Sequence, residues 1–193
     1  MNTDLLLPAH PRHTHAVVVG AGTIGLSTIM CARAAGAAQV IALEMSSARK
    51  AKALEVGASQ VLDPSRCDAL GEIRALTGGL GADVSFECIG NKHTAKLAID
   101  AIRKAGKCVL VGIFEEPSEF NFFELVSTEK QLLGALAYNG EFADVIAFIA
   151  DGRLDIAPLV TGRIGLEEIV ERGFEELVNN KEHNVKIIVS PGG

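Results

Sequence analysis

The chain has 193 residues, of which 48% are hydrophobic and 22% are charged, and its formal net charge is −6 at pH 7. This composition predicts one folded domain with a short extension and excludes wholesale disorder, and no apolar run is long enough to span a membrane. The acidic balance, the single tyrosine and the absence of tryptophan argue against a nucleic-acid-binding surface.

Residues 1–14 are polar and punctuated by proline, which predicts a flexible tail. From residue 16 onward, short apolar runs alternate with helical stretches. Strands are expected at residues 16–19, 39–43, 60–62, 84–89, 107–111 and 131–137. Helices are expected at residues 23–35, 47–56, 68–76 and 93–105. Three of these helices are expected to end at a left-handed glycine, namely Gly36, Gly57 and Gly106.

The expected strands are runs of valine, isoleucine, leucine and alanine with little polar alternation. Such strands are covered on both faces, as in a parallel sheet with helices on each side. The strand–helix repeat therefore predicts an α/β fold built on a doubly wound parallel six-stranded sheet.

Two amphipathic helices and a strand are expected after this sheet. Apolar faces are formed by Phe142, Val145, Ile146 and Ile149 and by Leu166, Ile169, Val170, Phe174 and Leu177. The last strand, at residues 185–189, has no obvious partner in the six-stranded sheet.

A glycine-rich turn joins the first strand to the first helix, with the letters GAGTIG at residues 20–25. Gly20 permits a tight turn, Gly22 lets a pyrophosphate approach the backbone, and Gly25 lets the helix pack closely on the sheet. The helix N-terminus, where Thr23 stands, offers N–H groups and partial positive charge to the phosphates. A GxGxxG between a strand and a helix predicts a dinucleotide-binding site.

An acidic residue, Glu44, closes the second strand. A carboxylate there can accept hydrogen bonds from the adenosine ribose and would repel a 2′-phosphate, so NAD is predicted rather than NADP. Arg49, one helical turn later, can reach the same ribose and would partly offset that repulsion.

Two alternatives to a dehydrogenase domain remain open at this point. One is a stand-alone nucleotide-binding or regulatory module, which would bind NAD(H) without turning over an alcohol. The other is an S-adenosylmethionine-dependent methyltransferase, which also has a glycine-rich loop and an acid after the second strand. Methyltransferase sheets usually end in an antiparallel hairpin, which the six-strand parallel pattern disfavours.

From residue 16 to residue 191 the chain resembles the cofactor-binding half, a Rossmann domain, of the zinc-dependent medium-chain alcohol dehydrogenases. Within that family it most resembles the butanediol dehydrogenases and their relatives, the threonine and sorbitol dehydrogenases, and residues 159–177 in particular resemble the butanediol group. The resemblance rests on the stretches GAGTIGLS, VIALEMSSARKAKALEVGASQVLDPS, TGGLGADVSFECIG, GKCVLVGIF, LVTGRIGLEEIVERGFEEL and HNVKIIVSP. The reaction it implies is NAD-dependent oxidation of a secondary alcohol or diol.

The resemblance also implies roles for single residues in cofactor binding. Ile24 would back the nicotinamide ring, and Glu44 and Arg49 would hold the adenosine ribose. Lys186 would contact the pyrophosphate. The adenine region would be lined by Cys88 and Ile89, and the nicotinamide end by Val111, Gly112, Ile113, Leu136 and Tyr138.

Family members begin with a GroES-like domain that supplies the zinc ligands and the proton relay, and no residue here maps onto those ligands. We therefore expect no catalytic residue and no metal site in this chain, with the alcohol substrate bound only when that domain is present. Residues 154–193 are expected to extend toward the missing domain, with an open apolar face around Ile164, Phe174 and Ile187.

The expected organisation is a tail at 1–14, a cofactor-binding domain at 15–153 and the extension at 154–193. The resemblance implies a homo-oligomer formed through the edge strand at 131–137. Four cysteines without a CxxC pair indicate neither a zinc knuckle nor a disulfide framework, so the chain is predicted to be cytoplasmic.

Overall fold

The computed structural model describes residues 14–138 and 140–192. One sheet contains six strands in the order β3-β2-β1-β4-β5-β6, and all five pairings are parallel. The strands are β1 (His15–Val19), β2 (Gln39–Leu43), β3 (Gln60–Leu62), β4 (Ala82–Glu87), β5 (Ile102–Leu110) and β6 (Gln131–Gly134). This order confirms the predicted doubly wound α/β fold. It argues against the methyltransferase alternative, whose sheets usually end in an antiparallel hairpin, because every pairing described in this sheet is parallel.

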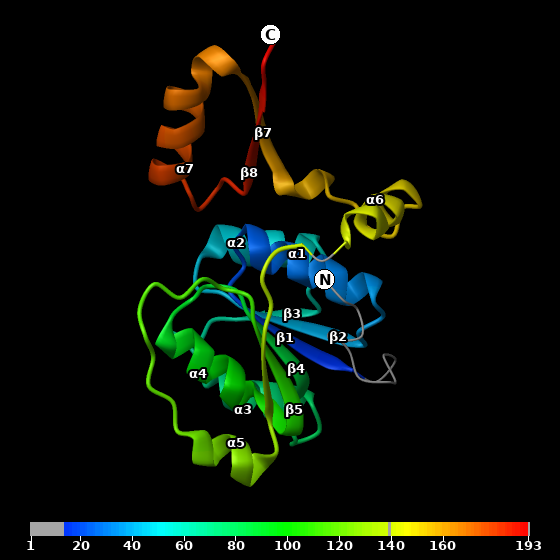
Figure 1. Cartoon of the computed structure of the whole chain (residues 1–193), viewed down its shortest axis with the longest axis vertical. Helices are drawn as coiled ribbons and strands as arrows, with labels where there is room; N and C mark the ends of the chain where they lie inside the picture. The colour runs from blue at the N-terminus through cyan, green and yellow to red at the C-terminus, as the bar shows by residue number, and fades with distance from the viewer. Residues whose placement is uncertain (1–13, 139, 193) are drawn as a thin grey trace.

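Helices cover both faces of this sheet (Figure 1). They are α1 (Thr23–Ala34), α2 (Ser47–Glu55), α3 (Ala69–Leu76), α4 (Lys92–Ala101) and α5 (Phe122–Thr128). Alternate residues of β1 point to opposite layers. Ala16 and Val18 join the core formed with α1 and α2, whereas Val17 and Val19 join the core formed with α3 and α4.

Side chains cap most of the helices that follow these strands. Helices α2, α3, α4 and α5 each begin after a residue whose side chain accepts a backbone N–H, namely Ser46, Asp68, Asn91 and Asn121. Helix α1 begins after Gly22, which has no side chain to cap it. The first N–H groups of α1 are therefore left for other acceptors.

The end of α4 differs from the prediction. The helix stops at Ala101, and β5 begins at Ile102, so the expected helix at 93–105 was too long. Ala105, with φ of 55°, takes the left-handed conformation that was expected of Gly106. Arg103 Nε donates to Asp83 Oδ1 at 2.8 Å, an ion pair that draws residues 102–106 alongside β4. Gly36 and Gly57 do have positive φ, as predicted.

The sheet edge and the tail also differ from the expected bounds. Strand β6 ends at Gly134 rather than at residue 137. Residues 1–13 of the expected tail lie outside the described residues. Thr14, which was assigned to that tail, is buried, and its carbonyl accepts the N–H of Ala38 at 2.9 Å.

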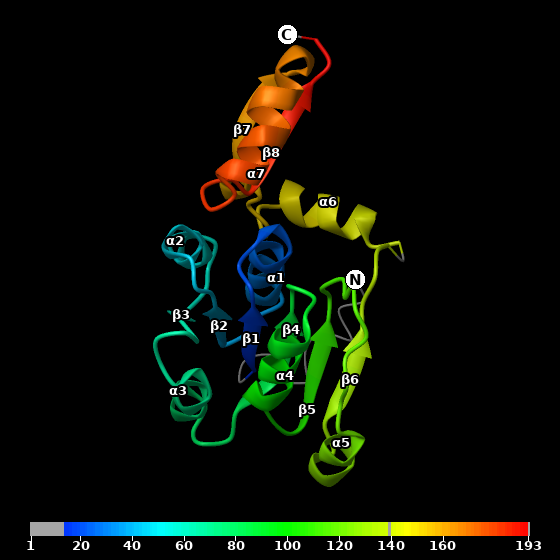
Figure 2. The ribbon, with the colours of Figure 1, turned by 90° about the vertical axis from the view of Figure 1, so that its left-hand side faces the viewer.

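The C-terminal segment forms a second unit beyond α1 and α2 (Figure 2). Helix α6 (Phe142–Ala150) and η3 (Ala157–Leu159) lead to β7 (Val160–Gly165), which pairs in parallel with β8 (Lys186–Ser190). The single helix expected from Leu166 is instead a succession of η4 (Leu166–Glu168), the π-helix η5 (Ile169–Glu175) and α7 (Glu176–Asn179).

The apolar face expected on this unit is present in part. Phe174 is 61% exposed and Val170 is 56% exposed on η5. Ile187 is half-buried, and Ile164 is buried, because β7 turns it toward Gly173 of η5. Within the described residues, no helix is long and apolar enough to cross a membrane.

Candidate functional site

The glycine turn after β1 has the geometry that a dinucleotide-binding turn requires. Gly20 has φ of 93°, a conformation that favours glycine. A Cβ on Gly25 would lie 1.8 Å from the carbonyl oxygen of Gly20, so the helix and the turn are in direct backbone contact. A Cβ on Gly22 would meet nothing within 4 Å. The turn therefore leaves open space over the uncapped start of α1, where the backbone N–H groups can receive an anionic group.

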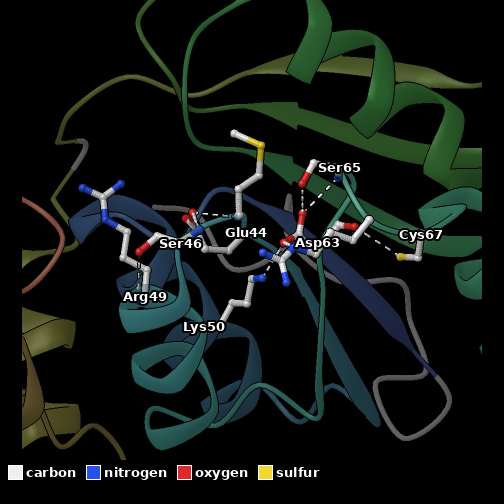
Figure 3. Close-up of polar contacts among 9 residues, drawn as sticks. Glu44, Ser46, Arg49, Lys50, Asp63, Ser65 and Cys67 are labelled. Atoms are coloured by element: carbon white, nitrogen blue, oxygen red, sulfur yellow. Dashed lines mark hydrogen bonds and ion pairs between the residues drawn. The ribbon is translucent and has the colours of Figure 1, made fainter.

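Glu44 ties the end of β2 to this turn. Its Oε2 accepts the N–H of Ala21 at 2.9 Å, and its Oε1 accepts the N–H groups of Met45 at 2.8 Å and Ser46 at 2.9 Å. Figure 3 shows the carboxylate beside Ser46 at the head of α2. Because Oε2 accepts only one of these bonds, it retains a lone pair for a ribose hydroxyl.

The segment between α7 and β8 returns to the same turn from the far end of the chain. Arg49 Nη2 donates to the carbonyl of Lys181 at 3.1 Å, and Thr23 Oγ1 donates to the carbonyl of Val185 at 2.9 Å. Lys186, the first residue of β8, follows directly and is exposed. Residues 181–186 therefore lie beside the glycine turn and the head of α2.

Exposed apolar side chains gather where β1, β4, β5 and β6 end. They are between 49% and 86% exposed: Ile24, Ile89, Ile113, Leu136 and Tyr138. In open α/β sheets, ligands bind outside the carboxyl ends of the strands, which is where these residues stand. The neighbouring Val111 and Gly112 are half-buried.

Cys88 completes this region as a neutral group. Its sulfur lies 3.7 Å from Thr28 Oγ1, and burial raises the pKa of its thiol to about 12. A thiol with this pKa stays protonated near neutral pH and acts as a small apolar surface.

Glu87, the last residue of β4, organises this region and was missed in the sequence. Its side chain is fully buried and accepts the N–H groups of Ile89 and Gly90 and the hydroxyl of Thr94 at 2.8 to 3.1 Å. Its backbone carbonyl accepts the N–H groups of residues 111 and 112 at 2.9 Å. The sequence could have indicated this role, because Glu87 is an acidic residue within a strand predicted to be buried, and a buried carboxylate must be hydrogen-bonded.

Asp63 fixes the loop after β3 to α2, next to the site (Figure 3). The hydrogen bond from Lys50, followed by those from Ser65, lowers the pKa of Asp63 to about 2. Because its pKa is lower in the folded chain than in the unfolded one, the ionised Asp63 carboxylate stabilises the fold above about pH 4, the ordinary pKa of the group. That stabilisation is lost as the pH falls toward 2.

Replacing Asp63 with asparagine is therefore expected to lower stability at pH 7 and to change it less at pH 2, as measured by urea midpoints across this range. Lys50→Met, which removes the cation, is expected to raise the pKa of Asp63 and to move the acid transition to higher pH. Parallel stability curves for the wild type and Asp63→Asn would contradict this account.

The described residues do not fit a zinc site. Among residues 14–138 and 140–192, no group of three or more histidine, cysteine, aspartate or glutamate side chains could hold a metal ion. His93 and His183 are both exposed and stand on different elements. We therefore assign no zinc ligand among the described residues.

Comparison with known proteins places this geometry in a family. The sequence profile of the family described as zinc-binding dehydrogenase matches residues 23–151. The chain is 40% identical over 177 residues to (R,R)-butanediol dehydrogenase of Neisseria gonorrhoeae, covering 91% of this chain and 50% of that protein. It spans about half the length of the curated relatives it matches.

Solved structures share the fold. 2R,3R-butanediol dehydrogenase from Bacillus subtilis superposes with a TM-score of 0.87 at 36% identity, over 93% of this chain and 51% of that one. A putative zinc-binding dehydrogenase from Sinorhizobium meliloti 1021, bound to NADP, gives a TM-score of 0.82 at 29% identity, over 92% of this chain and 52% of that one. With its six-stranded sheet and glycine turn, the chain belongs to the zinc-binding dehydrogenase family, and it corresponds to the cofactor-binding half of these relatives.

Proposed function

We propose that this chain binds a nicotinamide dinucleotide, preferring NAD(H), as part of a dehydrogenase that oxidises a secondary alcohol or diol. The observation that carries the proposal is the open space at Gly22, over the uncapped start of α1 and beside the Glu44 carboxylate. The open space admits a pyrophosphate, and the carboxylate accepts a ribose hydroxyl. The relatives are named for butanediol and sorbitol, which supports a secondary alcohol as the substrate of the whole protein.

The chain's own residues bind and orient the cofactor along the carboxyl edge of the sheet. Gly20, Gly22 and Thr23 would hold the pyrophosphate, with Lys186 as its cation, and Glu44 and Arg49 would hold the adenosine ribose. Cys88 and Ile89 would line the adenine region. The nicotinamide ring, which supplies hydride transfer when bound, would be held by the residues at the ends of β1, β5 and β6, namely Ile24, Val111, Gly112, Ile113, Leu136 and Tyr138.

A homo-oligomer is proposed through the edge of the sheet. Strand β6 stands last in the strand order, so its outer N–H and C=O groups face away from β5. An edge of this kind can pair with the same strand of a second copy. The residues proposed for this contact are those of the predicted strand at 131–137.

A fluorescence titration of NADH into the chain, with NADPH run beside it, tests the proposal. We expect saturable binding of NADH and at least tenfold weaker binding of NADPH, because Glu44 repels a 2′-phosphate. Failure of both nucleotides to bind would overturn the cofactor role. Equal binding of the two would leave the nucleotide site and overturn the preference for NAD.

A further inference from the structure

We propose that Glu182 is a specificity-determining residue, a second carboxylate that disfavours a 2′-phosphate at the adenosine ribose. This inference rests on the proposed nucleotide site and adds a residue to it. The residue comes from the segment between α7 and β8, which Figure 2 shows reaching down to the heads of α1 and α2.

Two hydrogen bonds fix that segment on either side of Glu182. Before it, the carbonyl of Lys181 accepts Arg49 Nη2 at 3.1 Å. After it, the carbonyl of Val185 accepts Thr23 Oγ1 at 2.9 Å. Both donors belong to elements predicted to surround the ribose and the pyrophosphate, so Glu182 is held at the rim of that site.

Ser46 joins Glu182 to Glu44. The N–H of Ser46 donates to Glu44 Oε1 at 2.9 Å, and its Oγ accepts the N–H of Arg49 at 3.4 Å. The nearby Ser46 hydroxyl, with the charges of Arg49 and Lys181, lowers the pKa of Glu182. Glu182 therefore belongs to the same polar cluster as Glu44, Ser46 and Arg49.

A 2′-phosphate needs the same donors. Hydroxyl, backbone N–H and arginine groups bind phosphate oxygens, and an arginine near the acid at the end of β2 is the usual partner of a 2′-phosphate. Here that arginine donates to the Lys181 carbonyl and lies close to the charge of Glu182. A 2′-phosphate would displace these contacts and face two carboxylates, whereas a ribose hydroxyl is neutral and is repelled by neither.

Glu182→Gln tests the inference, because glutamine keeps an acceptor for Ser46 and removes only the charge. We expect the Kd for NADPH to fall about fivefold and the Kd for NADH to stay within twofold, which is the effect of one nearby exposed charge on a phosphate. In 0.5 M salt the gain for NADPH is expected to shrink, since exposed charges are screened.

Glu72→Gln is the matched control. Glu72 is an exposed carboxylate of α3, on the opposite face of the sheet from α1 and α2, so this variant makes the same change in net charge away from the ribose. We expect it to leave both Kd values unchanged.

Three results would overturn the inference. The first is an unchanged ratio of the NADPH and NADH Kd values in Glu182→Gln, and the second is an equal shift for both nucleotides, which would show a structural effect alone. The third is the same shift in Glu72→Gln. Failure of the wild-type chain to bind NADH is a separate result, and it would overturn the proposed function together with this inference.

Discussion

Replacing Gly25 with alanine is expected to lower the free energy of unfolding by about 3 kcal/mol. The new Cβ would lie 1.8 Å from the carbonyl oxygen of Gly20 and 2.8 Å from its carbonyl carbon. Both are backbone atoms of the tight turn, so the clash is relieved only by moving α1 away from β1. Urea denaturation of the variant beside the wild type measures the loss.

Gly22→Ala is the matched control variant, because it makes the same substitution at the second glycine of the same turn. Its Cβ would meet no atom within 4 Å, and its φ of −74° suits alanine. Its stability is therefore expected to stay within about 0.5 kcal/mol of the wild type. Its NADH affinity is expected to fall at least tenfold, because the methyl group fills the space proposed for the pyrophosphate. A destabilised Gly22→Ala or a fully stable Gly25→Ala would contradict the roles assigned to the two glycines.

Glu44→Gln is expected to weaken NADH binding by about ten- to hundredfold, the effect of losing a hydrogen bond to a charged group. NADPH binding is expected to weaken less or to improve, because the repulsion of its 2′-phosphate is removed. Parallel titrations of the two nucleotides measure the change in preference.

Glu44→Asp separates charge from reach. It keeps the carboxylate on a shorter side chain, so we expect it to retain the preference for NADH at reduced affinity. Because Glu44 and Glu182 both lie near Ser46, the double variant Glu44→Gln/Glu182→Gln is expected to depart from additivity. An unchanged nucleotide preference in Glu44→Gln would contradict the role proposed for this carboxylate.

Local patterns predicted most of the sheet. Strands β2 and β3 match the expected ranges 39–43 and 60–62 to the residue, because their apolar runs are short and bounded by polar residues. The glycine turn was identified because its three glycines have steric roles that depend on their own neighbours. The close backbone contact between Gly20 and Gly25 could therefore be predicted from residues 20–25 alone.

Features that depend on distant contacts were missed. The end of α4 was misplaced because Arg103 and Gly106 look like a helix end, while the ion pair with Asp83 comes from another strand. Strand β7 was not predicted, since its partner β8 follows only after η4, η5 and α7. Glu182 stands in a run of charged residues typical of a wet surface, and its contact with Ser46 exists only in the folded chain.

The bond between Thr23 and Val185 joins residues 162 positions apart, so the proposed nucleotide site can be completed only late in synthesis. At about 5–20 residues per second, a ribosome adds Val185 roughly 8–32 s after Thr23. The early strands and α1 can form during that interval, because β1 pairs with β2 and β4, which are both synthesised well before Val185. A bound nucleotide stabilises a protein only once its site exists. The early strands therefore meet residues 181–186, and complete the proposed site, only after their own sheet has had time to form.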